Sequence, residues 1–200
     1  MRTTSNSKQE MKTIFYTGKG DKGASAMGKK KISKDNQLFH VLGTLDEVNS
    51  WVGFARTEAM RRSADKKKLS WVAESLLEVQ ESLFVAQAEV AAVGMGWKPK
   101  IRITKKHIDE AQARIATVDA KVPQLKNFVI PGGSELSSRI DIARTISRRL
   151  ERTVVSLSKK KKLNAELLQY LNRLSSVLFA LARFVEFVQK IKYTHPKYQY

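Results

Sequence analysis

Apolar residues recur at intervals of three and four over most of the chain, which is the spacing of one face of an α-helix. Five segments show this pattern, over residues 38–55, 69–90, 104–118, 134–157 and 164–188. Thr104 and Ser134 stand at the start of two of them, and such side chains accept hydrogen bonds from the free N–H groups of a first helical turn. The pattern therefore predicts an all-α, up-and-down five-helix bundle.

Three stretches lack this periodicity, at residues 16–35, 94–103 and 123–133. The first contains the sequence TGKGDKGASA and predicts an irregular, glycine-rich loop before the first helix. The chain has 200 residues, enough for one ordinary core. We therefore expect a single domain over residues 13–190, preceded by a flexible leader at 1–12 and followed by a tail at 191–200.

Composition narrows the chemistry that this bundle can support. The absence of Cys excludes disulfides, iron–sulfur clusters and thiol catalysis, and three scattered His residues do not favour a metal centre. The net charge of +18 is typical of proteins that bind nucleic acid. However, the basic runs at 29–31, 61–68 and 159–162 fall in predicted loops or helix ends, without interleaved aromatic residues. We therefore expect mostly solvated lysines, neither nucleic acid nor a membrane as partner, and keep nucleic-acid binding as an alternative.

The glycine-rich loop is the first candidate site. Gly18, Gly20 and Gly23 match the pattern G-x-G-x-x-G, and two lysines lie between them. Without a surrounding βαβ unit this pattern does not indicate a dinucleotide fold, and Ala24 stands where a P-loop needs Lys. Backbone N–H groups that converge beside lysines can still bind a polyphosphate. A flexible basic segment without a ligand explains the same residues, so both readings stay open.

The fourth predicted helix carries a row of charged residues that step by three and four, which places them on one face opposite the leucines. The members of this row are Asp141, Arg144, Arg148, Glu151 and Arg152, with Arg149 beside them. Guanidinium groups bind phosphate oxygens through paired hydrogen bonds, so the row suits a triphosphate. A solvated charged surface is the alternative.

Two further segments carry candidate residues. Phe128 begins an apolar stub that leads into Pro131-Gly132-Gly133 and the Ser134 cap, where an aromatic ring can be placed beside a pocket. Asn172 interrupts the apolar seam of the fifth helix and needs a hydrogen-bond partner there.

Taken together, these segments resemble the PduO-type ATP:cob(I)alamin adenosyltransferases over roughly residues 13–190. The family motifs appear here in order as TGKGDKGAS (17–25), KDN (34–36), GTLDEVNS (43–50), FVIPGGS (128–134), ARTISRRLER (143–152) and NRLS (172–175). The segments at 34–36 and 43–50 form one motif, and five separate motifs in the right order and spacing are far more specific than any one of them.

The resemblance implies a homotrimer with active sites between subunits. In the family, ATP and its Mg²⁺ lie against the N-terminal loop, the arginine helix and the last helix, and no protein side chain is expected to ligate the metal. Carried over by motif, the cofactor-binding residues are Thr17, Gly18, Lys19, Gly20, Ser25, Ala26, Lys34, Arg148, Arg149, Leu150, Glu151, Arg152 and Asn172.

The resemblance also implies the reaction. Co(I) of cob(I)alamin attacks C5′ of ATP and expels triphosphate, so the shortage of His and Cys is no obstacle. Among the implied catalytic residues, Arg148 would stabilise the charge on the leaving triphosphate, and Arg144 would pair with Asp46 across subunits and support the site. Phe128 would shape the lower face of the corrin. A reductase and an adenosylcobalamin-dependent enzyme would be partners, and the expected location is cytoplasmic.

The chain departs from the family pattern at a few positions. Asp141 replaces a usual His, Leu150 a usual Ala, and Ser176 a common Asp. The family does not explain the high positive charge. The alternative to catalysis is a basic helical bundle that binds nucleic acid or senses ATP without turnover.

Overall fold

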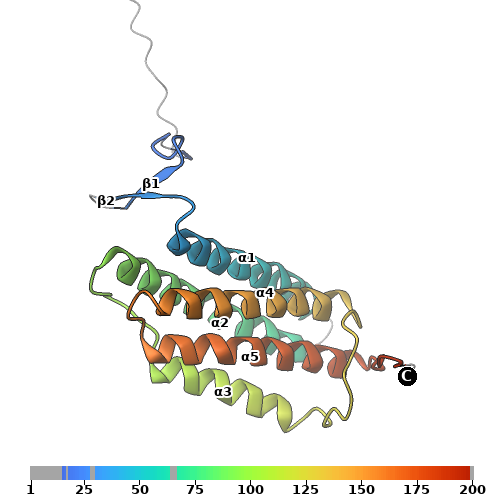
Figure 1. Ribbon diagram of the computed structural model, residues 1–200. Coiled ribbons are helices and arrows are strands. Elements are labelled where there is room, and N and C mark those ends of the chain that lie inside the picture. The colour runs from blue at the N-terminus through green and yellow to red at the C-terminus, as the bar shows by residue number, and fades with distance from the viewer. Residues whose placement is uncertain (1–14, 17, 28–29, 64–66, 199–200) are drawn as a thin grey trace, which may run out of the picture. The chain divides into compact units, whose positions relative to one another are not determined.

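The computed structural model describes residues 15–16, 18–27, 30–63 and 67–198. Residues 15–36 and 37–198 belong to two separate compact units, and each is considered by itself. The second unit contains five helices, α1 (Gln37–Ser63), α2 (Lys68–Met95), α3 (Lys105–Asp119), α4 (Glu135–Ser158) and α5 (Ala165–Gln189). The five-helix prediction is therefore confirmed (Figure 1).

Helix α5 packs against three other helices of this bundle, α2, α3 and α4. Helix α4 lies between α1 and α5, and α2 also packs against α1 (Figure 1). Leu150 of α4 and Leu171, Leu174 and Leu178 of α5 are all at most 1% exposed, so the predicted apolar seams meet in the core. This packing fixes the direction in which the polar side chains of α4 and α5 point.

Side chains cap the helices where the sequence predicted their starts. The Ser134 hydroxyl accepts a hydrogen bond from Ser137 N at 3.2 Å and begins α4. Asn164 Oδ1 accepts one from Glu166 N at 3.0 Å, while its Nδ2 donates to Ile103 O at 2.8 Å. Asn164 thus both caps α5 and ties the loop before α5 to the loop before α3.

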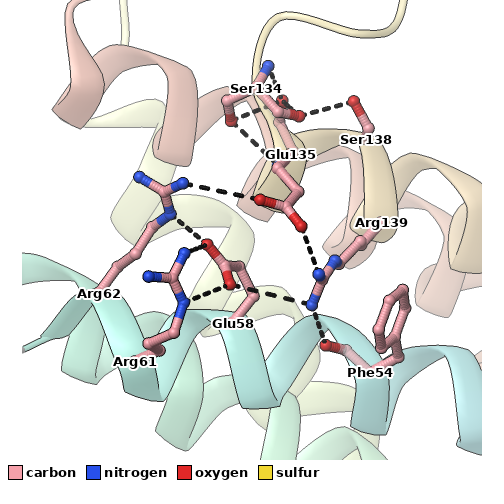
Figure 2. Close-up of polar contacts among 9 residues, drawn as sticks. Phe54, Glu58, Arg61, Arg62, Ser134, Glu135, Ser138 and Arg139 are labelled. Carbon is pink, nitrogen blue, oxygen red and sulfur yellow. Dashed lines mark hydrogen bonds and ion pairs between the residues drawn. The ribbon is translucent and has the colours of Figure 1, made fainter.

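A charged cluster joins the end of α1 to the start of α4 (Figure 2). The Glu58 carboxylate, only 3% exposed, accepts hydrogen bonds from Arg61 at 2.8 and 2.9 Å and from Arg62, and Arg139 of α4 lies 4.0 Å away. Arg139 also donates to Phe54 O at 3.1 Å and stacks on the Phe54 ring. The hydrogen bonds from Arg61 outweigh burial and lower the pKa of Glu58 to about 2.

The prediction that the whole N-terminal stretch is irregular is wrong. Strands β1 (Ala24–Met27) and β2 (Lys30–Ser33) pair antiparallel, with Ser25 opposite Ile32 (Figure 1). Each strand has four residues, and Ala24–Met27 and Lys30–Ser33 lack the long alternating apolar pattern by which strands are found in a sequence. The pairing is carried by backbone hydrogen bonds, which leave no mark on residue type.

Candidate active site

The arginine row of α4 is built on a buried leucine. Leu150 is fully buried, whereas Arg148, Arg149 and Arg152 are exposed, because the apolar stripe of α4 points into the bundle. The side chain of Leu150 therefore supports the arginine row from below, and it does not reach a ligand on the exposed surface. Arg148 and Arg152, four residues apart, present two guanidinium groups on one helical face.

Arg149 points in a different direction. Its guanidinium forms an ion pair with Glu47 of α1, and both side chains remain about half exposed. An exposed pair of this kind contributes little to stability and can exchange for a stronger anionic partner.

A hydrogen bond joins the arginine helix to the last helix. Asn172 Nδ2 donates to Glu151 Oε1 at 2.7 Å, and Arg173 donates to Asn172 Oδ1 at 2.9 Å. Asn172 is exposed, so the expectation that it lies near the core is wrong; the expected hydrogen-bond partner is present. The structure thus brings Glu151 and Asn172 together at the surface.

A cavity of about 410 Å³ lies beside this row, between α3, α4, α5 and the segment that follows α3. Arg144 and Arg148 form its charged wall, and Phe179 belongs to its apolar wall. Its remaining lining residues are Ile115, Val118, Asp119, Val122, Pro123, Gln124, Leu125, Ser175, Ser176, Ala180 and Arg183. Three arginines in the wall of a largely apolar cavity suit a ligand that combines a large apolar surface with negative charge.

Asp141 does not share the exposed face that the sequence predicted for it. It is 4% exposed and packs against α5, where Arg183 NH2 donates to its Oδ2 at 2.6 Å. Arg144 donates from Nε to Asp141 Oδ1 at 2.8 Å. The helical spacing is as expected, but a cation on α5 draws this carboxylate inward.

A second buried carboxylate, that of Glu186, lies on α5. Glu186 is 1% exposed, and desolvation raises its pKa although Arg183 lies 3.3 Å away. A β-carbon built on Gly133 would lie 2.6 Å from Glu186 Oε1, so this acid packs tightly against the Pro131-Gly132-Gly133 turn.

The glycine-rich loop forms tight turns within its own unit. Gly18 and Gly23 have φ values of 67° and 72°, which side chains other than glycine rarely adopt. Asp21 N donates to Gly18 O at 3.3 Å, and Lys34 N donates to Gly23 O at 2.9 Å. A β-carbon on Gly20 would lie 3.0 Å from Lys34 Nζ, so the fold brings the Lys34 ammonium group against the loop backbone.

The other predicted loop residues occupy the same unit. Lys19 is exposed, Ser25 and Ala26 lie in β1, and Thr17 lies outside the described residues. The structure thus brings Lys34 and the glycines together, with Ser25 on the adjoining strand.

Two further predicted catalytic residues, Phe128 and Asp46, have exposed side chains. Phe128 is 80% exposed, and His195 Nδ1 lies 2.8 Å from its carbonyl oxygen. Asp46 is exposed on α1, and within the described part of the chain Arg144 pairs with Asp141 rather than with Asp46. Both side chains remain accessible to another molecule.

Sequence reasoning missed Phe179 and Arg183, which line the cavity. Phe179 is 40% exposed beside the apolar stripe of α5, where the sequence gives it no special role, whereas Arg183 is buried within that stripe, where an arginine is unexpected. The signal that could have found them was a basic residue inside an otherwise apolar run at 177–185.

The chain is similar to a set of known proteins over almost all of this architecture. Residues 15–185 match the family model described as cobalamin adenosyltransferase. This chain belongs to the cobalamin adenosyltransferase family. The corrinoid adenosyltransferase of Bacillus subtilis (strain 168) is 36% identical over 171 residues, 86% of each protein. That of Bos taurus is 32% identical over 85% of this chain and 70% of its own.

Solved structures of the family have the same fold. A variant PduO-type ATP:corrinoid adenosyltransferase from Lactobacillus reuteri, complexed with cobalamin and ATP, superimposes with a TM-score of 0.79 at 30% identity. The match covers 92% of this family member and 99% of the Lactobacillus chain. Among the described residues of this family member, no helix has the length and apolar character needed to cross a membrane.

Proposed function

We propose that this chain transfers the 5′-deoxyadenosyl group of ATP to the cobalt of cob(I)alamin. In this reaction a Co–C5′ bond forms, the bond between C5′ and the triphosphate oxygen breaks, and triphosphate leaves with the electron pair. The observation that carries the proposal is the arginine wall of a 410 Å³ cavity in a member of this family. The family to which the chain belongs favours this transfer over nucleic-acid binding and over ATP sensing without turnover.

The exposed arginines of α4 are proposed to bind and stabilise the triphosphate. Negative charge develops on the leaving oxygen as the C5′–O bond breaks, and a preorganised guanidinium stabilises it without reorientation. Arg148 is placed for this task because it lies both on the exposed row and on the cavity wall. Arg152 and Arg149 would bind further phosphate oxygens, Arg149 after leaving Glu47.

Glu151 and Asn172 are proposed to hold the nucleoside. Their hydrogen bond at 2.7 Å orients both polar groups at the surface. Each keeps capacity to bond with a ribose hydroxyl or an adenine edge, since a carboxylate has two oxygens and an amide both donates and accepts. Together with the arginines they would orient C5′ for in-line attack, which is the main contribution that the protein can make when the corrinoid supplies the nucleophile.

The cavity is proposed to receive the corrinoid. Its apolar wall, which includes Phe179, would keep water from the lower face of the corrin, and the exposed Phe128 ring would cover part of the same face. Exclusion of water favours loss of the lower cobalt ligand, and this makes reduction to Co(I) easier.

A phosphate-binding role is also proposed for the glycine-rich loop, considered by itself. Its glycines form tight turns, and Lys34 and Lys19 add positive charge beside them. Mg²⁺ would arrive bound to the phosphates of ATP. Thr17, Gly18, Gly20, Ser25 and Ala26 complete the proposed contacts.

We further propose a homotrimer, with Asp46 of one subunit paired to Arg144 of the next. The exposure of Asp46, and the partly open position of Arg144 at the cavity rim, support this arrangement. A reductase that supplies Co(I) and an enzyme that uses adenosylcobalamin are the proposed partners, and the proposed location is the cytoplasm. Light scattering on the purified protein should give the mass of three chains; a monomer would contradict the assembly.

The reaction is tested anaerobically with chemically reduced cob(I)alamin and Mg-ATP. The expected result is adenosylcobalamin, followed by its absorption spectrum, with one triphosphate released for each molecule formed. Release of ADP and phosphate instead would identify an ATPase and overturn the proposal. ATP binding without any product would leave the sensor alternative in its place.

A further inference from the structure

The buried carboxylate of Asp141 binds two arginines at the boundary of α4 and α5. Its Oδ1 accepts from Arg144 Nε at 2.8 Å, and its Oδ2 accepts from Arg183 NH2 at 2.6 Å. Asp141 and Arg183 are 4% and 3% exposed, while the Arg144 side chain keeps 21% of its surface. Two members of this group are therefore fixed in the core, and the third reaches the surface.

The surface that Arg144 reaches is the proposed site. Both Arg144 and Arg183 line the 410 Å³ cavity together with Arg148. Their guanidinium carbons lie 5.9 and 5.3 Å from the centre of the Phe179 ring, which belongs to the same wall. The group thus connects the core of the bundle to the wall of the cavity.

A stabilising role alone does not account for this group. A buried ion pair commonly adds no more stability than apolar side chains of the same size, because removing charges from water is costly. What such a pair does supply is a fixed direction for its hydrogen bonds. A long arginine side chain has many rotamers, and a carboxylate on its Nε removes most of them while leaving the terminal NH2 groups available.

We infer that Asp141 and Arg183 are positioning residues that hold the Arg144 guanidinium at the cavity wall. Arg183 orients Asp141, and Asp141 orients Arg144. Arg183 is held in turn by Glu186, whose carboxylate lies 3.3 Å from its NH1. The inference rests on the proposed function, since it needs Arg144 to act in the site.

A double-mutant cycle tests the inference, using kcat and KM for ATP in the cob(I)alamin assay. The variants are Asp141→Asn, which keeps the shape but removes the charge, Arg144→Ala, and the two combined. If Asp141 acts through Arg144, Asp141→Asn lowers kcat about tenfold in the wild type and changes it less than about twofold in the Arg144→Ala background. KM for ATP should change little. The matched control is Asp109→Asn, which removes an exposed carboxylate of α3 that does not line the cavity and should leave kcat unchanged.

Equal losses in both backgrounds would show that Asp141 acts independently of Arg144 and would overturn the inference, as would full activity of Asp141→Asn. Should Asp141→Asn fail to fold by circular dichroism, Arg183→Lys replaces it in the cycle, because lysine keeps the charge but lacks the planar fork. The same cycle measured on inorganic tripolyphosphate binding by calorimetry needs no turnover. Wild-type protein without turnover therefore counts against the proposed function, and an additive cycle counts against the inference.

Discussion

Asn172 of α5 donates a hydrogen bond to Glu151 of α4 at 2.7 Å, across 21 residues of sequence. Asn172→Asp would place two carboxylates at this distance, so their repulsion should turn both side chains away from the nucleoside. We expect KM for ATP to rise about tenfold, the scale of one hydrogen bond to a charged group. Steady-state kinetics with varied ATP measures this change.

The double variant Glu151→Gln, Asn172→Asp is the control for that change. It exchanges the two groups, so the amide of residue 151 donates to the carboxylate of residue 172. Recovery of KM toward the wild-type value is expected if mutual orientation is what matters. If KM for ATP in the double variant stays as high as in Asn172→Asp, ATP binding instead requires a carboxylate at residue 151 and an amide at residue 172.

Arg148→Ala should have the largest effect on the chemical step. This substitution removes a guanidinium from the row on α4 and from the cavity wall. Loss of one charge-stabilising donor costs roughly 3 kcal/mol, so kcat should fall about a hundredfold. Single-turnover formation of adenosylcobalamin measures it. Lys105→Ala, which removes an exposed cation on α3, should retain wild-type kcat, and near-normal turnover of Arg148→Ala would remove Arg148 from the site.

Glu58 should make the fold sensitive to acid. Its pKa of about 2 lies below the ordinary value of 4.5, so its ion pairs stabilise the fold above pH 4.5 and are lost as the pH falls toward 2. Glu58→Gln should lower the free energy of unfolding by about 1 to 3 kcal/mol at pH 7, with the deficit shrinking in acid. Urea titrations at several pH values measure it. Glu135→Gln, at the exposed side of the same cluster, should show a much smaller deficit.

Glu186 should make the stability of the fold depend on pH in the opposite direction. Burial raises the pKa of Glu186 above 4.5, because the neutral acid is easier to bury than the carboxylate. The neutral acid therefore stabilises the fold below pH 4.5, and this stabilisation is lost as the pH rises through the folded pKa. Glu186→Gln imitates the neutral acid. Its free energy of unfolding should therefore improve relative to the wild type as the pH is raised from about 4.5 to about 8.

The control is the exposed Glu166→Gln at the start of α5, whose stability should follow that of the wild type across the same range. Should the difference between Glu186→Gln and the wild type stay constant with pH, the carboxyl is ionised in the fold and the expectation is wrong. A difference that moves in the other direction would mean that Arg183 dominates over burial.

The helices could be predicted because their apolar stripes are long and regular. Leu76, Leu83, Leu171 and Leu178, all placed on predicted seams, are at most 1% exposed. The hairpin at 24–33 could not be found in this way, since strands of four residues contain too few positions for a pattern. Local spacing is therefore informative only where many turns repeat it.

In the candidate site, too, spacing predicted what one helix determines and missed what several helices determine together. Helical spacing placed Arg148 and Arg152 together on α4, because that relation depends on one helix alone. Asp141 obeyed the same spacing yet turned inward, because Arg183 of α5 offered it a buried cation. The cavity wall needs α3, α4 and α5 at once, and no pattern within a single segment indicates it.

By itself, the sequence determined five amphipathic helices, the caps at Thr104 and Ser134, and the row of arginines, together with the family motifs. These features follow from interactions within a few turns of chain. Only the tertiary structure decided which polar groups are buried, which carboxylate pairs with which arginine, and where a cavity opens. Desolvation and ion pairing depend on distances between residues remote in sequence, such as Asp141 and Arg183, and packing alone fixes those distances.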